Sequence, residues 1–226
     1  MTKLLAQNQK LYMPIPNYFY EKNIISSGFK VIAGIDEVGR GTLAGPVVVG
    51  LIILKINKEL ENSLIELGVN DSKKLSVKKR CSIYEELIKI AIDYSSGWAT
   101  AKEIDNLGIN ESIQLCINRG ISKLNIQPDH LLIDALNLNN SKIHQTSIIK
   151  GDSKSLSIAG ASIIAKVERD KYMENLDKNY DVYDFKNNKG YGTKNHLSAI
   201  KKYGRSDLHR YSYKIKNIDK QEWKNK

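Results

Sequence analysis

The sequence predicts an α/β fold, a mixed sheet with helices on its faces. Two β-branched apolar runs, at 31–36 and 46–54, are separated by a glycine-rich connection, which is typical of an antiparallel strand pair. A third strand and several helical segments follow, and two short apolar runs then stand before a long helical segment. This order of three strands, helices, two strands and helices favours a single mixed sheet.

The first half of the chain provides the antiparallel strands and the first helices. Apolar residues recur at helical spacing through 77–92, and Ser76 is placed to cap that helix. The elements expected next are a strand at 94–100 and two helices, at 101–107 and 110–124, divided by Gly108.

The second half contributes two short strands and a long helix. The runs 130–134 and 144–150 are strand candidates, and 153–178 is most simply one helix. Its apolar face is expected to carry Ile158, Ala161, Ala165, Tyr172 and Leu176. After Tyr180 the chain becomes rich in Tyr, Lys, Asn and Gly, with one helical piece near 196–203.

Composition favours a basic protein of a reducing compartment. The chain has 226 residues, enough for one main domain with a short appendage, and its net charge is 35 − 25 = +10, which favours a polyanionic partner. Cys81 and Cys116 have no second Cys or His at ligand spacing, so neither a zinc site nor a disulfide framework is indicated. The longest apolar run, 46–54, is too short to cross a bilayer and no secretory signal is evident, so we expect a cytoplasmic protein without a membrane partner.

Three carboxylates stand where predicted strands end. Asp36 ends the first strand, Asp134 ends "HLLID", and Asp152 follows "SIIKG". Neighbouring strands lie about 4.8 Å apart, so acids at the same sheet edge can converge. Carboxylates without His or Cys suit Mg²⁺ or Mn²⁺, and one or two such ions could support hydrolysis of a phosphodiester.

Glu37 and Asp170 raise separate questions. Neighbouring strand residues point to opposite faces, so Glu37 can join Asp36 only if the strand twists or bulges there. Asp170 lies about 27 Å beyond Asp152 along an unbroken helix, and we expect it to be structural. Each of the other acids also has a structural interpretation, as a turn residue, a strand end or, for Asp152, a helix cap. The recurrence of acids at three strand ends favours the metal site.

The glycine-rich segment "GRGTLAG" does not fit a nucleotide-binding loop. Such a fingerprint requires the glycines to open a helix, whereas here Pro46 and a second strand follow. A nucleic-acid-binding protein that uses only its positive charge remains an alternative, and it would show no metal requirement.

Several long motifs resemble bacterial ribonuclease HII, the type 2 ribonuclease H family. They cover about residues 20–213, in the order expected of that family. The matching segments are "GIDEVGRGTLAGPVV", "NDSKKLSVKKR", "LLIDA", "KGDSKSLSIAGASIIAKVERD", "KGYGTKNH" and "YGRSDLHRYSY".

The resemblance implies an endonuclease that cuts the RNA strand of RNA–DNA hybrids and incises duplex DNA 5′ of embedded ribonucleotides, leaving a 5′-phosphate and a 3′-hydroxyl. It implies a ribonuclease H-like catalytic domain over 20–180, a helical extension over 181–213 that contributes to substrate binding, and a basic flexible tail over 214–226. We expect a monomer, and a replication clamp is a conceivable partner of the tail.

The resemblance also assigns residues. The catalytic and metal-binding acids are expected to be Asp36, Glu37, Asp134 and Asp152, with Mn²⁺ or Mg²⁺ as cofactor. The segment Gly39, Arg40 and Gly41 is expected to line the ribose 2′-hydroxyl, since reading that group needs a close backbone approach. Tyr191 is expected to pack on the sugar at the RNA–DNA junction. Basic side chains for phosphate contacts are offered by Lys73, which is favoured, and by Lys74, Lys78, Lys79 and Arg80, although the last three could equally form a solvated basic helix end.

Three positions depart from the usual family pattern. Thr42 and Arg205 stand where proline is common, and Ala135 stands where glycine is usual. If the backbone at Ala135 needs a positive φ, alanine strains it by about 1 kcal/mol.

Overall fold

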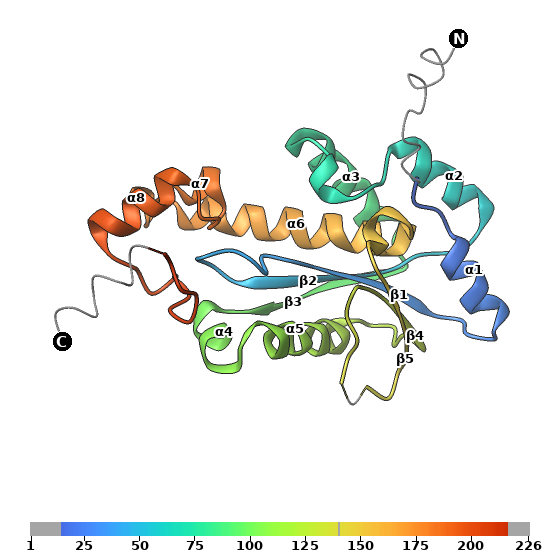
Figure 1. Cartoon of the computed structure of the whole chain (residues 1–226). Coiled ribbons are helices and arrows are strands. Elements are labelled where there is room, and N and C mark those ends of the chain that lie inside the picture. Colours follow the sequence, from blue (N-terminus) through green and yellow to red (C-terminus); the bar gives the residue numbers. More distant parts are fainter. Residues whose placement is uncertain (1–14, 140, 217–226) are drawn as a thin grey trace, which may run out of the picture.

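A five-stranded mixed sheet forms the centre of the molecule (Figure 1). The computed structural model describes residues 15–139 and 141–216. The strands, in the spatial order β3-β2-β1-β4-β5, are β1 (Ile32–Val38), β2 (Val47–Ile53), β3 (Asp93–Ala99), β4 (His130–Asp134) and β5 (His144–Ile148). The predicted α/β fold is confirmed.

The antiparallel pairing predicted for the first strands is present. β1 is antiparallel to β2, and β2 to β3, whereas β4 is parallel to both β1 and β5. In the parallel part Ile35 pairs with Ile133, and Asp134 pairs with Ile148. The carboxyl ends of β1, β4 and β5 therefore meet at one edge of the sheet.

Helices cover both faces of the sheet (Figure 1). α6 crosses one face, with α3 packed on it, and α5 covers the opposite face together with α4. The helices are α1 (Phe19–Ser26), α2 (Lys58–Leu67), α3 (Val77–Ile90), α4 (Ala101–Leu107), α5 (Ile109–Lys123), α6 (Leu156–Leu176), α7 (Phe185–Asn188) and α8 (Lys194–Tyr203), and the 3₁₀ turns are η1 (Ser72–Lys74), η2 (Gly151–Ser153) and η3 (Asp181–Tyr183).

Three helices, α1, α2 and α7, were not predicted, and one was predicted too long. α1 and α2 went unpredicted, although Asn57 caps α2 through the N–H of Leu60 and Gly68 ends it with a φ of 82°. The single helix expected over 153–178 instead begins at Leu156, because the Ser155 hydroxyl accepts from the N–H of Ile158. Asp152 therefore does not cap α6 and belongs to η2.

The first half of α6 is buried on all sides, so the single apolar face expected for it is wrong. Every residue from Leu156 to Ala165 is buried, whereas Tyr172, expected on the buried face, is 41% exposed. The reason is that α6 lies between the sheet and α3, so that nearly its whole circumference is covered. Residues such as Ile158, Ala161 and Ile163 thus reach different neighbours.

Glycines allow the helices to approach the sheet closely. A Cβ on Gly34 would lie 2.2 Å from the carbonyl carbon of Ser157, and one on Gly50 would lie 2.3 Å from the carbonyl oxygen of Ala161. On the other face a Cβ on Gly97 would lie within bonding distance of the carbonyl oxygen of Cys116 in α5. Both helices are therefore set against the strands at positions without a side chain.

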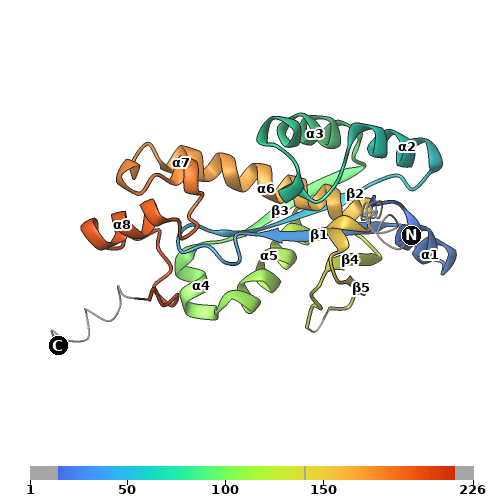
Figure 2. The same cartoon turned by 45° about the horizontal axis from the view of Figure 1, so that its top comes forward.

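The C-terminal part packs around the end of α6. α7 and α8 lie at the end of the molecule opposite α1 in both views (Figures 1 and 2). Their common core includes Met173, Phe185 and Ile200, and Ala44 of the β1–β2 connection joins it. Ile215 is also buried there, so the first described residues of the expected tail are packed, while 217–226 lie outside the described residues.

None of the helices in the described part of the chain is both long and apolar enough to cross a bilayer.

Replacing Gly97 with alanine is expected to destabilise the fold by at least about 3 kcal/mol, because α5 would have to move away from β3. Gly160→Ala is the matched control, since its Cβ would make only ordinary contact with Ile52 at 3.4 Å and alanine is favoured within a helix. Urea unfolding measures both variants. Equal stabilities would contradict the close approach at Gly97.

Candidate metal centre and nucleic-acid site

Three carboxylates converge at the sheet edge where the parallel strands end. Asp36 lies near the end of β1, Asp134 ends β4, and Asp152 follows β5 within η2. One oxygen from each of these three side chains lies within 4.8 Å of the others. The convergence predicted from the strand ends is thus present for these three acids.

Local hydrogen bonds orient two of these acids. The carboxylate of Asp134 accepts from the N–H of Gly151 at 2.7 Å, which ties the β5–α6 turn to the end of β4. The carboxylate of Asp36 accepts from the N–H of Glu37 at 2.7 Å. The turn that carries Asp152 is therefore fixed by Asp134 itself.

The cluster is electrostatically unfavourable without a cation. Burial raises the pKa of Asp36 well above its ordinary value, and the charges of Glu37, Asp134 and Asp152 raise it further, while a hydrogen bond from Ser162 opposes them. Burial likewise raises the pKa of Asp152, followed by the charge of Asp71. A divalent cation would relieve this repulsion, so the donor set fits a hard metal ion.

Glu37 stands beside this group rather than within it. Glu37 follows Asp36 along β1, and successive side chains of a strand point to opposite faces. Its carboxylate lies 3.7 Å from the guanidinium of Arg40. Burial raises the pKa of Glu37, Arg40 lowers it, and Asp134 raises it again, so its charge acts on the cluster. Its carboxylate oxygens are not part of the group of three in this structure.

A hollow of about 590 Å³ opens beside the acids. Lys73 of η1 lies at its edge, 4.0 Å from the carboxylate of Asp152, with 70% of its side chain exposed. Burial works against the charge of Lys73, but Asp36 and Asp152 raise its pKa overall. The hollow is lined by acids and lysines, namely Asp71, Lys73, Lys74, Asp134, Lys150, Asp152 and Lys154, together with Ala135, Ile149 and Ser153.

Ala135, next to Asp134, has a φ of 47°. The condition under which we expected strain at this departure is therefore met. A left-handed conformation costs a non-glycine residue roughly 1–2 kcal/mol. The strain lies at the rim of the hollow, where Ala135 is exposed.

The Gly39–Gly41 segment is held by a buried arginine. Arg169 of α6 is fully buried, and its guanidinium donates to the carbonyls of Pro46 and Ala44 and to the Thr42 hydroxyl. The Thr42 hydroxyl in turn donates to the carbonyl of Gly39 at 3.0 Å. Gly39 has a φ of 91°, and a Cβ there would meet Arg169 Nε. Thr42, which departs from the family pattern, is therefore one of the hydrogen-bond partners of Arg169.

Arg40 and Gly41 are exposed on the loop that Arg169 holds in place. The Arg40 side chain donates to Asn110 of α5 at 2.7 Å, and its carbonyl accepts from buried Arg210 at 3.0 Å. Nothing lies within 4 Å of the position that a Cβ on Gly41 would occupy. The backbone at Gly41 can therefore be approached closely by a ligand.

Tyr191 is held through its backbone by a chain of two histidines. His196 Nδ1 donates to the Tyr191 carbonyl at 2.9 Å, and His209 Nδ1 accepts from the N–H of Ser206 at 2.9 Å. The two Nε2 atoms lie 3.0 Å apart, so His209 must donate to His196. Burial lowers the pKa of both rings, to about 4 for His209, which keeps the pair neutral at neutral pH. Tyr191 as a whole remains 39% exposed.

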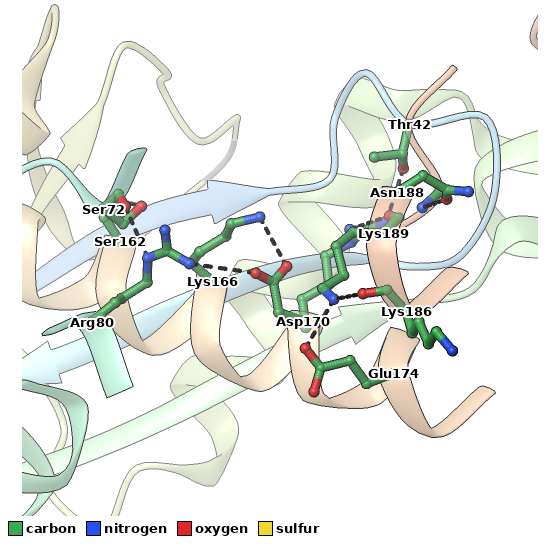
Figure 3. A network of polar contacts seen from close by, with 12 residues as sticks. Thr42, Ser72, Arg80, Ser162, Lys166, Asp170, Glu174, Lys186, Asn188 and Lys189 are labelled. Carbon is green, nitrogen blue, oxygen red and sulfur yellow. Dashed lines mark hydrogen bonds and ion pairs between the residues drawn. The ribbon is translucent and has the colours of Figure 1, made fainter. Parts of the chain in front are cut away.

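Arg80 and Asp170 are structural. Arg80, one of the basic residues offered for phosphate contacts, is buried, and its guanidinium lies 3.5 Å from Asp170. Asp170 also pairs with Lys166 at 2.8 Å and takes no part in the acid cluster, as expected (Figure 3). Arg205, another departure from the family pattern, donates to the carbonyls of Arg210, Tyr211 and Tyr213.

Sequence reasoning missed several residues of the site. Asp71 lines the hollow and acts on Asp152, although it stands directly before Ser72 and Lys73 in a motif that was recognised. Ser162 and Arg169 lie within a helix whose periodicity gives no sign of their contacts. Only the packing of α6 beneath the loop places Arg169 there.

Comparisons with known proteins show what the chain is similar to. The family model described as Ribonuclease HII matches residues 33–226. The chain is 50% identical over 201 residues to the ribonuclease HII of Staphylococcus carnosus, covering 88% of this chain and 74% of the relative. It is 43% identical over 203 residues to that of Caldicellulosiruptor bescii, covering 89% and 95%.

Solved structures show the same fold. Ribonuclease H2 from Pyrococcus horikoshii superposes with a TM-score of 0.71 at 27% identity, over 87% of this chain and 100% of that one. Ribonuclease HII from Archaeoglobus fulgidus, solved as a complex with PCNA, gives 0.68 at 27% identity, over 84% and 100%. A ribonuclease HIII solved with Mn²⁺ gives 0.64 over 87% and 70%, and at 20% identity it supports the fold alone.

Asp36→Asn is expected to stabilise the metal-free protein by about 1–2 kcal/mol at pH 7.5. The pKa of Asp36 is 3.8 when unperturbed and is raised on folding, so ionising this group costs stability as the pH rises. The advantage of the variant should shrink as the pH falls through the raised pKa. Urea unfolding with EDTA measures it. In saturating Mn²⁺ the order should reverse, because only the wild type gains strong binding energy, about 2.7 kcal/mol at 100 times Kd.

Ala135→Gly is expected to raise the free energy of unfolding by about 0.5 kcal/mol. The relief of roughly 1–2 kcal/mol at a positive φ is partly offset by the greater entropy of glycine in the unfolded chain. Ala199→Gly, within α8, is the control and should lose about 1 kcal/mol. A loss of stability at both positions would argue against strain at Ala135.

Proposed function

Because the chain belongs to the ribonuclease HII family, we propose that it incises duplex DNA on the 5′ side of single embedded ribonucleotides, leaving a 5′-phosphate and a 3′-hydroxyl. The family membership makes the chain a divalent-metal-dependent endoribonuclease that acts on RNA–DNA hybrids. The observation that carries the proposal is the group of three carboxylates beside a hollow that is lined by lysines as well as acids.

The acids are proposed to bind the ions and to place the scissile phosphate. Asp36, Asp134 and Asp152 provide the converging oxygens, and Glu37 contributes from the end of the same strand after a side-chain rotation. Divalent ions bound there, Mn²⁺ or Mg²⁺, would supply an activated water and compensate charge on the leaving oxygen. Lys73 is proposed to contact a phosphate oxygen, since its ammonium group is exposed beside Asp152.

We assign selection of the ribonucleotide to the Gly39–Gly41 loop and to Tyr191. Gly39, Arg40 and Gly41 would hydrogen-bond the 2′-hydroxyl through their backbone, which is held rigid by Arg169 and Arg210. A site built to bind a hydroxyl rejects the analogue lacking it by about 10⁴-fold or more. Tyr191 would pack its exposed ring on the sugar at the RNA–DNA junction.

The proposal also covers the location, the oligomeric state and a protein partner of the enzyme. We propose a cytoplasmic monomer in accord with its composition, since the net charge of +10 suits a nucleic-acid substrate. A clamp as partner is suggested by the Archaeoglobus fulgidus protein, which was solved with PCNA. The contact was expected in the tail 214–226, of which residues 217–226 lie outside the described part.

Asp36→Asn and Asp134→Asn are each expected to reduce cleavage by at least about 10³-fold, because metal catalysis contributes several kcal/mol to the barrier. The substrate is an end-labelled duplex with one ribonucleotide, incubated with Mn²⁺ or Mg²⁺ and, in parallel, with EDTA. Binding of the uncleaved duplex should persist. The mapped cut should lie 5′ of the ribonucleotide.

Glu86→Gln is the matched control, since Glu86 forms an exposed ion pair with Lys89 on α3. It should cleave like the wild type. Cleavage that survives both aspartate changes, or proceeds in EDTA, would contradict the proposed metal site. An all-DNA duplex cut at the same rate would contradict selection through the 2′-hydroxyl.

A further inference from the structure

A polar row runs along α6 on the side that faces η1 and the Lys189–Tyr191 segment. Ser162, Lys166, Asp170 and Glu174 are spaced four residues apart and so lie on one line of the helix (Figure 3). Each makes a contact outside α6, and the family resemblance assigned a role to none of them. The row lies beside two substrate elements, because Ser162 contacts η1 and Lys166 contacts Tyr191.

At one end the row fixes the turn that carries Lys73. The Ser162 hydroxyl lies 2.8 Å from the hydroxyl of Ser72, which directly precedes Lys73. Arg80 donates to the Ser72 carbonyl at 2.8 Å and to the Leu75 carbonyl at 2.9 Å. The guanidinium of Arg80 also lies 3.5 Å from Asp170 (Figure 3). The turn is therefore connected to α6 at two residues, directly at Ser162 and through Arg80 at Asp170.

In the middle of the row Lys166 reaches Tyr191. Its ammonium nitrogen lies 5.8 Å from the centroid of the Tyr191 ring and 2.8 Å from the carboxylate of Asp170. The Lys166 side chain is only 14% exposed. An ammonium group this close to a ring face attracts it, and the attraction is stronger where water is excluded.

At the far end the row holds the backbone before Tyr191. Glu174 pairs with Lys189 at 2.9 Å, and the carbonyl of Lys189 accepts from Arg169 (Figure 3). The Tyr191 carbonyl is held by His196. The backbone is therefore fixed independently of Lys166, which contributes an ammonium group over the Tyr191 ring.

We propose that Lys166 is a positioning residue that orients the Tyr191 ring towards the RNA–DNA junction, and that Asp170, shared with Arg80, holds Lys166 in place. The inference rests on the proposed function, since it concerns the part given there to Tyr191. Lys166 acts through the ring rather than on a phosphate, because its ammonium group is largely buried and already paired with Asp170. Loss of the lysine would leave the metal centre intact and the ring unoriented.

The kinetic test compares two substrates, a duplex with one ribonucleotide and a long RNA–DNA hybrid, where most cuts lie away from a junction. Lys166→Met is expected to lower kcat/KM about 10-fold on the first and less than about 2-fold on the second. Lys166→Arg, which keeps the cation, should restore most of the loss. In a Tyr191→Ala background Lys166→Met should have no further effect, because the two changes remove one interaction.

Lys171→Met is the matched control. Lys171 lies on the same helix with its ammonium nitrogen 5.0 Å from the ring centroid of Tyr84, and it is exposed. It should leave both rates unchanged. The inference would be overturned if the losses in kcat/KM caused by Lys166→Met and Tyr191→Ala multiplied in the double variant. It would also be overturned if Lys166→Met lowered kcat/KM equally on both substrates.

A measurement without cleavage separates this inference from the proposed function. 3-Fluorotyrosine is incorporated at position 191 alone, and its ¹⁹F spectrum is recorded for the free protein. Lys166→Met and Asp170→Asn should shift and narrow the signal, as expected for a released ring, whereas Lys171→Met should not. An unchanged signal in Lys166→Met overturns the inference even if the enzyme cuts at ribonucleotides. A changed signal supports it even if the wild type cuts only hybrids.

Discussion

Repulsion among carboxylates at the carboxyl ends of parallel strands is the constraint on which the rest of this structure depends. Asp36 is buried, and the charges of Asp134 and Asp152 act on it directly. The fold must therefore hold these side chains together against their own charge. It does so through β1–β4 pairing, the bond from Gly151 to Asp134, and the ammonium group of Lys73 beside Asp152. In the proposed function, a divalent cation bound among these carboxylates would relieve this repulsion.

A second set of buried charges, this time positive, holds the loop to which the proposed function assigns substrate selection. Arg169 and Arg210 direct their donors at carbonyls of the β1–β2 connection, and Arg169 also reaches the carbonyl of Lys189. Two segments that are distant in sequence are thereby fixed to α6 and to each other. The carbonyls of the loop turn inward, and exposed Gly41 is left available to a ligand. Rigid backbone is what discrimination of a single hydroxyl requires, because a flexible loop would also accommodate the deoxy sugar.

Thr42 and Ala135, two departures from the family pattern, differ in how much of their structural role could be inferred from the sequence. Thr42 takes a hydrogen bond from Arg169 and gives one to Gly39, so it is integrated into the loop. Ala135 keeps a backbone conformation that favours glycine, and its strain lies next to Asp134. For Ala135 the consequence followed from the sequence once a positive φ was assumed. For Thr42 no local rule could reveal a partner 127 positions away.

The sequence by itself determined the strands, most helices and the strand ends that carry Asp36, Asp134 and Asp152, because alternation, helical period and capping are local properties. It failed for the first half of α6, whose burial on all sides leaves no single apolar face, and for α1, α2 and α7. Only the tertiary structure decided that Glu37 stands beside the three acids, that Arg80 is buried against Asp170 and that Asp71 lines the hollow. Strand alternation and helix packing bring such groups together from distant positions, and no pattern along the chain records which of them meet.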